Sequence, residues 1–395
     1  MMNNKQWTTS MVFAVVSIFF VALNMRPAVT AIGPLFNVLM DSLHVSNTQM
    51  SLLTSIPVFC MGLFAPVAVP LQKRLGTKFA IALLLTLIAL ANGLRLLKEN
   101  YVLLVGTSFA VGFAIAIIGP MLNAFIKEKF PNRFTTVVGV YSFGIGTGAT
   151  LSAALTVSFY NGFQQKWTIA LGSWAVLAVI ALMIWLLVIE KKQVLTRVHE
   201  NEQSKEAARN PWKNARAWTI LVYFGLQTSL FFSLMSWLTP MLQDKGMSLV
   251  AASTMLTFLS IVQMIGNIVV PLLMEKWSSR IRWLLSLGIM GVIGFALLSV
   301  GTGFVLWMAV FIIGVVLSGL FPIGLLLPLD EARNHSEANS WSSMVLSGGF
   351  MMSAVIPTII GYCYDVTGNH VYTYAIFLAL MFGILCTTLI LKKRE

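Results

Sequence analysis

Apolar segments of helical length follow one another along almost the whole chain and are separated by short polar loops. Of the 395 residues, 57% are hydrophobic and only 10% are charged. A helix needs roughly 20 apolar residues to cross a bilayer, whereas barrel strands alternate apolar and polar residues over about ten positions. The continuous segments therefore predict an all-α polytopic membrane protein with about twelve transmembrane helices. We place these helices at about 9–37, 46–71, 79–97, 101–126, 134–160, 167–189, 216–241, 248–273, 282–301, 304–329, 339–364 and 370–391.

Basic residues are distributed unevenly between the loops on the two sides of the predicted membrane. The chain has 26 Lys and Arg against 14 Asp and Glu, and its formal net charge is +12. If the N-terminus is cytoplasmic, the basic residues of the external loops are Arg95, Lys98, Lys166 and Lys245. Since positive residues concentrate in cytoplasmic loops, we predict that both termini are cytoplasmic. The basic charge then reflects membrane topology, and we expect no nucleic-acid partner.

A polar stretch at 190–215 divides the predicted helices into six and six, and short motifs recur on either side of it. The recurring pairs are Val69-Pro70-Leu71 with Val270-Pro271-Leu272, Gly112 with Gly314, Pro120 with Pro322, and Ser142-Phe143-Gly144 with Ser347-Gly348. Matches in the same order at a nearly constant spacing indicate a duplicated six-helix unit. We predict an N-terminal bundle at 1–189, a cytoplasmic linker at 190–215 and a C-terminal bundle at 216–395.

Arg26 is the only charged residue that lies well inside any of the predicted helices. A cation in hydrocarbon costs roughly 3 kcal/mol even on lenient scales, so it normally faces a cavity or a partner. No Asp or Glu lies deep enough in another predicted helix to be that partner, and we therefore expect an anionic solute to be the partner. Pro27 should also break the helix beside Arg26, because it lacks a backbone N–H. The alternative is that Arg26 caps the freed carbonyls or extends to the membrane surface.

The run Asn24–Leu35 has the pattern N-x-R-P-A-x-T-x-x-G-P-L. With its two six-helix halves and long linker, the chain resembles the major facilitator superfamily, and this run is similar to the cyanate-permease and nitroimidazole-transporter family. The loop 72–78 matches the superfamily's signature loop only in part, because the leading Gly-x-x-x-Asp is missing. The resemblance implies a substrate site at mid-membrane between two halves that rock against each other. It also implies a small anion or a small organic compound as cargo and a place for Arg26 in the cavity.

Uncharged polar residues inside the predicted helices are the other candidates for the site. Gln227 lies 201 residues after Arg26, so a neutral amide would stand opposite the guanidinium and suit a monovalent anion. Gln263 and Asn267 are four residues apart and share a helix face. The remaining candidates are Asn24, Asn123 and Tyr141. For these residues the alternative is a hydrogen bond between packed helices.

Several other conspicuous residues have structural interpretations. The glycine-rich run Gly139–Gly148 lacks the Gly-Lys-Ser/Thr ending of a phosphate-binding loop, and small residues in a membrane helix favour close packing. Trp237 and Trp341 lie near predicted helix ends, where Trp commonly anchors a protein at the membrane surface. The three cysteines show no metal-binding spacing, and we expect neither a metal nor another cofactor.

Together these features predict a secondary active or facilitated transporter that moves a small anion by alternating access, as a monomer in the cell membrane. The alternative within this class is an exporter of neutral or aromatic compounds in which Arg26 is structural. A channel would need rings of charge or a carbonyl filter, an enzyme would need a catalytic constellation, and an ATP-driven pump would need a Walker motif. The sequence contains none of these. Asp41 and Asp365 are the nearest groups to a proton relay, which leaves uniport, anion exchange and proton transport on the substrate as alternatives.

Overall fold

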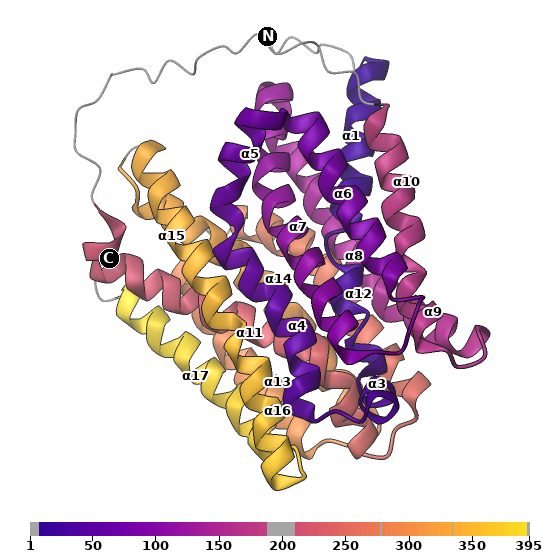
Figure 1. The fold of residues 1–395 in the computed structure, drawn as a ribbon. Helices are drawn as coiled ribbons and strands as arrows, with labels where there is room; N and C mark the ends of the chain where they lie inside the picture. The colour runs from indigo at the N-terminus through magenta and orange to yellow at the C-terminus, as the bar shows by residue number, and fades with distance from the viewer. Residues whose placement is uncertain (1–7, 188–209, 277–278, 334, 393–395) are drawn as a thin grey trace.

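The structure, a computed structural model, describes residues 8–187, 210–276, 279–333 and 335–392, and within these ranges it contains helices and no strand. The first half comprises α1 (Thr9–Leu23), α2 (Pro27–Thr30), η1 (Gly33–Leu35), α3 (Phe36–Leu43), α4 (Asn47–Leu63), η2 (Ala65–Val67), α5 (Ala68–Leu75), α6 (Thr77–Leu94), α7 (Tyr101–Lys129), η3 (Pro131–Arg133), α8 (Phe134–Gly162), α9 (Trp167–Gly172) and α10 (Trp174–Leu186). The second half comprises η4 (Pro211–Lys213), α11 (Ala215–Asp244), α12 (Leu249–Lys276), α13 (Arg280–Val300), α14 (Phe304–Glu331), α15 (His335–Ser353), α16 (Val355–Thr367) and α17 (Val371–Lys392). Figure 1 shows the long helices lying side by side in one bundle.

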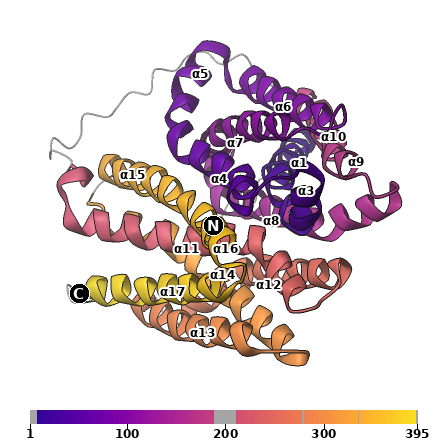
Figure 2. The same cartoon turned by 60° about the horizontal axis from the view of Figure 1, so that its bottom comes forward.

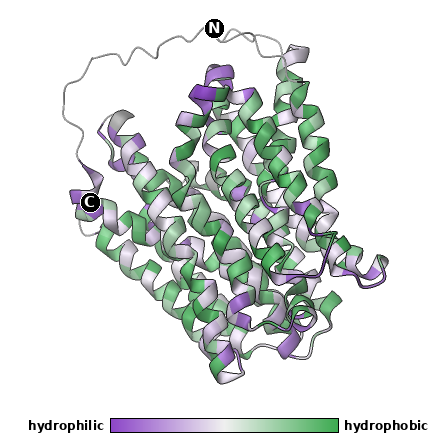
Figure 3. Cartoon of the chain, in the orientation of Figure 1, coloured by the Kyte–Doolittle hydropathy of each residue, from purple (hydrophilic) through white to green (hydrophobic). Residues whose placement is uncertain are grey.

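Within the described ranges, 11 helical segments are long and apolar enough to cross a membrane, and a twelfth is obtained when the bent pair Asn47–Leu63 and Ala65–Leu75 counts as one span. The two parts of this pair meet at 49°. Pro66 lies at the bend and cannot continue the backbone hydrogen bonds of the helix. Hydrophobic residues cover most of the helices (Figure 3). Each predicted span corresponds to one of these segments, so the all-α architecture with twelve membrane helices is confirmed.

The two halves repeat the same helix packing. In the first half α1 packs on α8, α4 on α7 and α6 on α10; in the second half α11 packs on α15, α12 on α14 and α13 on α17. Gly112 lies against Pro57, and the residues 202 positions later, Gly314 and Leu259, also lie against each other. Figure 2 shows the first half, in indigo to magenta, on one side of the molecule and the second half, in salmon to yellow, on the other. The duplicated six-helix unit is confirmed, with a register of 202 residues.

The glycine-rich run on α8 provides space for α1. A Cβ atom on Gly144 would lie 2.9 Å from the Cβ atom of Ala22, and one on Gly148 would collide with the carbonyl oxygen of Leu23. Gly349 on α15 makes a similar close approach to α11. Small residues let the backbones of membrane helices approach closely. The interpretation of this run as a packing surface is therefore confirmed.

The halves meet where α8 packs on α12 and where α4 packs on α15 and α16. Gly33 lies directly against the backbone carbonyl of Met235 on α11. These two residues are also 202 positions apart, so the axis that relates the halves passes between them. We call the end of the molecule formed by the loops 44–46, 95–100, 163–166, 245–248, 301–303 and 368–370 the distal face. An even number of spans places both described chain ends at the opposite face.

The predicted boundary between the halves falls mainly outside the described residues. Residues 188–209 are not described, and of the linker 190–215 only the part around η4 is. The division into 1–189, 190–215 and 216–395 and the cytoplasmic position of the termini therefore stay predictions.

Candidate functional site

Arg26 lies at a break in the first membrane span. α1 ends at Leu23, residues 24–26 form a turn, and helical structure resumes at Pro27. The backbone of Arg26 departs from helical geometry, with φ −121° and ψ −43°. Pro27 has no N–H to offer the carbonyl of Leu23, while the Thr30 hydroxyl donates to the Arg26 carbonyl at 2.9 Å. The predicted break beside Arg26 is confirmed.

The Arg26 guanidinium has no acidic partner among the described residues. Its central carbon lies 5.0 Å from the ring centroid of Phe231 and 5.1 Å from that of Phe232, both on α11 of the other half. The Nη1 atom is buried and has no hydrogen-bond acceptor within the described structure, although the residue as a whole is half-buried. A cation–π contact contributes roughly 0.5–2 kcal/mol. The guanidinium therefore keeps an unused hydrogen-bonding group in the interior, at the boundary between the halves.

Tyr141 and Gln227 are the predicted residues that the structure associates most closely with this group. Tyr141 on α8 is close enough for an electrostatic interaction with the guanidinium. Gly119 on α7 lies beside it, since a Cβ atom there would be 3.6 Å from the tyrosine hydroxyl. Gln227 is buried, and its Nε2 atom has no acceptor within the described residues. It lies one helical turn before Phe231 and so shares that ring's face of α11.

The register of 202 residues shifts the predicted correspondence between the two halves by one position. It relates Arg26 to Thr228, the neighbour of Gln227, whereas the spacing of 201 in the sequence pointed to Gln227 itself. Thr228 donates its hydroxyl hydrogen to the backbone of its own helix, 2.6 Å from the Phe224 carbonyl. The counterpart of the arginine is therefore a hydroxyl engaged in its own helix.

Gln263 and Asn267 lie on the inner side of α12. Ile261, Ile265 and Ile268 form its exposed stripe, with 37%, 53% and 51% of their surface accessible. Gln263 and Asn267 are half-buried on the opposite side of the helix. The Oδ1 atom of Asn267 is buried and has no donor partner within the described residues. Both residues therefore face the protein interior, and their place in the site stays a prediction.

The remaining two predicted residues have other surroundings. The Asn24 amide donates to the Phe20 carbonyl at 2.9 Å and to the Leu177 carbonyl on α10 at 3.3 Å. It thus makes the hydrogen bond between packed helices that was the alternative for these residues. Asn123 is exposed in the last two turns of α7, and no contact in the described structure links it to Arg26.

Arg95 is an interior arginine that the sequence analysis assigned to an external loop. It directly follows α6, yet its side chain turns inward and the residue is only 1% exposed. Its guanidinium donates to the hydroxyls of Thr107 and Ser108 on α7 and to the carbonyl of Ala28 on α2. The prediction that Arg26 is the only interior charge was therefore wrong. The pair Thr107-Ser108, about two turns into the next helix, was the available signal.

The two tryptophans predicted to anchor the membrane surface are instead in the protein core. Trp237 is fully buried, donates from Nε1 to the Pro357 carbonyl at 3.1 Å, and packs against Phe36 with ring centroids 4.5 Å apart. Trp341 is fully buried as well. The prediction failed because position along a helix does not reveal which side faces lipid.

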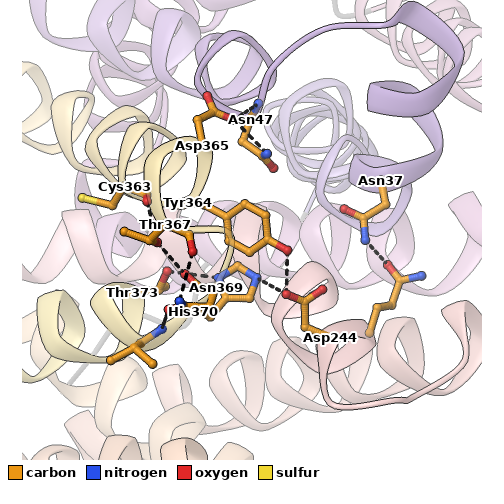
Figure 4. A network of polar contacts seen from close by, with 12 residues as sticks. Asn37, Asn47, Asp244, Cys363, Tyr364, Asp365, Thr367, Asn369, His370 and Thr373 are labelled. Carbon is orange, nitrogen blue, oxygen red and sulfur yellow. Dashed lines mark hydrogen bonds and ion pairs between the residues drawn. The ribbon is translucent and has the colours of Figure 1, made fainter.

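At the distal face, hydrogen bonds connect the two halves directly (Figure 4). The carboxylate of Asp365 on α16 accepts hydrogen bonds from the backbone and side chain of both Asn47 and Thr48, the first residues of α4, at 2.6–2.9 Å. The Asn37 amide donates to the Gln243 side chain at 3.1 Å. An anion at a helix N-terminus is stabilised by the free N–H groups there. Asp365 therefore joins the second half to the start of a first-half helix.

A second acidic group at this face belongs to the second half alone. Asp244 accepts a hydrogen bond from the Tyr364 hydroxyl at 2.7 Å and lies 3.6 Å from the imidazole Nε2 of His370. These three residues line a cavity of about 250 Å³ that also borders Asn37 and Trp237. Burial lowers the pKa of His370 to about 4, against the opposing effect of Asp244. The imidazole is therefore neutral at neutral pH.

A bundle of twelve membrane helices in two related halves, with a cation between them that has no acidic partner in the described part of the chain, has the architecture of a membrane transporter. Residues 12–354 match the family model of the Major Facilitator Superfamily, and the chain belongs to this family. It is accordingly a multi-pass cell-membrane protein that transports a small solute and is not an enzyme.

Relatives and solved structures agree with this assignment. The chain is 29% identical to the cyanate transport protein CynX of Escherichia coli over 374 residues, which cover 93% of this chain and 94% of the relative. It is 26% identical to the 2-nitroimidazole transporter of E. coli, over 90% of this chain and 89% of the relative. It is 28% identical to the uncharacterized transporter YycB of Bacillus subtilis, over 92% of this chain and 89% of the relative. Its fold is similar to that of a D-xylose-proton symporter, with a TM-score of 0.79 at 13% identity over 96% and 97% of the chains.

Proposed function

We propose that this transporter carries a small anion and that Arg26 supplies the counter-charge. The observation that carries the proposal is the buried Nη1 atom of Arg26, which has no acceptor within the described residues. An unsatisfied buried donor is costly, and a charged one more so. A solute that brings both an acceptor atom and a negative charge recovers this cost.

The polar groups near the guanidinium favour the same class of solute. Gln227 offers a second buried N–H group without an acceptor in the described structure, and Tyr141 offers a hydroxyl. The other interior arginine, Arg95, already uses its guanidinium within the first half. One available guanidinium with neutral donors suits a monovalent anion. The cyanate transport protein among the relatives is in keeping with this choice.

The hydrogen bonds at the distal face suggest how the solute enters. Asp365 and Asn37 connect the halves there, so opening that face requires these bonds to break. We infer that in this conformation the solute exchanges with the opposite face, and that transport alternates between the two. With the predicted membrane orientation, the opposite face is cytoplasmic.

Ligand-dependent thermal unfolding of the purified protein tests the proposal. Cyanate and other small monovalent anions should raise the Tm of the wild type by mass action and should not raise that of Arg26→Gln. Arg282→Gln is a matched control, because Arg282 is exposed in the first turn of α13 and its replacement removes the same charge. An anion that stabilises the wild type and Arg26→Gln equally would refute the role of Arg26.

The second candidate function is export of neutral aromatic compounds. Phe231 and Phe232 present ring surfaces to the interior beside Arg26, and one relative is a 2-nitroimidazole transporter. If only 2-nitroimidazole stabilises the protein, and does so equally in Arg26→Gln, this alternative replaces the anion proposal.

A further inference from the structure

Arg95 is a buried cation in the first half whose side chain makes three hydrogen bonds. Its Nε donates to the Thr107 hydroxyl at 3.1 Å, its Nη2 to the Ser108 hydroxyl at 3.3 Å and its Nη1 to the Ala28 carbonyl at 3.1 Å. All three acceptors are neutral. Three of the five N–H groups of the guanidinium are thus engaged within the first half, and only 1% of the residue's surface is accessible to a solute.

The Ala28 carbonyl is available to Arg95 because the first span is broken. α2 ends at Thr30, so its last internal hydrogen bonds run from Thr30 to the Arg26 carbonyl and from Ala31 to the Pro27 carbonyl. The next carbonyl, that of Ala28, is left for a donor outside the helix. In an unbroken helix this carbonyl would also accept a hydrogen bond from the amide four residues later; here Arg95 is its donor within the described structure.

We infer that Arg95 is a positioning residue that fixes α2 against α7 and thereby sets where Arg26 presents its guanidinium. α2 is only four residues long and follows Arg26 directly, so any movement of Ala28 is passed on to Arg26. The planar fork of arginine reaches three acceptors at once, which the point charge of lysine does not reproduce. This inference rests on the proposed role of Arg26 in anion binding.

Two changes separate the hydrogen bonds of Arg95 from its charge. Arg95→Lys keeps the charge and loses the fork, and Thr107→Val keeps the arginine and removes one acceptor. Both should weaken anion binding, measured as Kd, by roughly tenfold, the size expected for one hydrogen bond to a charged group. Lys98→Gln is the matched control, because Lys98 lies exposed in the same loop, and it should leave Kd unchanged.

A double-mutant comparison distinguishes positioning from a general loss of stability. In an Arg26→Gln background, Arg95→Lys should have no further effect on the residual anion affinity, because it acts through Arg26. An equal loss in both backgrounds, or the same loss in Lys98→Gln, would overturn the inference.

Hydrogen–deuterium exchange provides a readout that does not require an anion. Arg95→Lys and Thr107→Val should speed exchange of the backbone amides in residues 27–35, whereas Lys98→Gln should not. If the wild type binds no anion while exchange changes as expected, the proposed function fails and the anchoring of α2 stands. Unchanged exchange in both variants would overturn the positioning role itself.

Discussion

Replacing Asp365 with asparagine should open the distal face. The carboxylate accepts four hydrogen bonds from Asn47 and Thr48 across the boundary between the halves. An asparagine retains one acceptor oxygen. Its NH₂ group can only donate, so it cannot accept the two hydrogen bonds that the second carboxylate oxygen accepts. Two bonds to a charged acceptor would contribute about 3–6 kcal/mol if buried. Because Asp365 is exposed, we discount this to about 2 kcal/mol.

A change of about 2 kcal/mol alters an equilibrium constant roughly 30-fold. Since the bonds exist only while the halves are joined at this face, Asp365→Asn should raise the population open there by about that factor. The stability of each half should change little, because the bonds lost in this way lie between the halves.

Thiol accessibility in the purified protein measures this shift without assuming a membrane orientation. A reporter cysteine is introduced as Met40→Cys, at a half-buried residue that lines the distal cavity, after Cys60, Cys363 and Cys386 have been replaced by alanine. A bulky maleimide should modify the reporter about 30-fold faster in Asp365→Asn.

Asp41→Asn is the control for this experiment. Asp41 borders the same cavity and is exposed, and the described structure gives it no hydrogen bond. Asp41→Asn removes the same negative charge as Asp365→Asn and should leave the rate of maleimide labelling at the reporter cysteine unchanged. Equal rates in Asp365→Asn and its parent would refute the view that this carboxylate holds the face closed.

Two further predictions concern packing and pH. Gly148→Ala places a methyl group against the Leu23 carbonyl and should destabilise the protein by about 1–3 kcal/mol, lowering its Tm; Gly139→Ala in the same helix meets open space and should not. His370 has a folded-state pKa of about 4, below its unfolded value of 6.5. The unfolded state therefore binds more protons between these values, and the stability present above pH 6.5 is lost as pH falls toward 4. At pH 5 the loss is about 2 kcal/mol, so His370→Gln should show a smaller decrease in Tm from pH 7 to pH 5 than the wild type; an identical decrease would contradict the assignment.

Helix length and hydropathy were sufficient to predict the membrane spans, because a bilayer imposes a minimum apolar length on each helix. The break at Arg26 also followed from the sequence, since Pro27 cannot donate a backbone hydrogen bond whatever its surroundings. The packing of Gly144 and Gly148 was predictable for a similar local reason. These predictions depend on properties of the residues themselves, such as hydropathy, size and the lack of a backbone N–H, and not on their neighbours in the fold.

The predictions that failed depend on the direction of a side chain. Arg95 lies at the end of a helix, and its inward rotation depends on Thr107 in the next helix and on the Ala28 carbonyl, which is 67 residues away in the sequence. Trp237 likewise lies near a helix end, and only the packing of the halves reveals that it is buried. For the same reason, the sequence could propose Asn24 for the site but could not anticipate its hydrogen bond to α10.

The duplicated scaffold has kept its packing positions while the interior positions have diverged. Gly112 and Gly314 still occupy equivalent contacts, yet the residue equivalent to Arg26 is Thr228, beside Gln227. A single base change converts a glutamine codon into an arginine codon, so one point mutation could add a second guanidinium to the interior. If Arg26 recognises the charge of the solute, a family built in this way can evolve toward solutes of different charge without altering its fold.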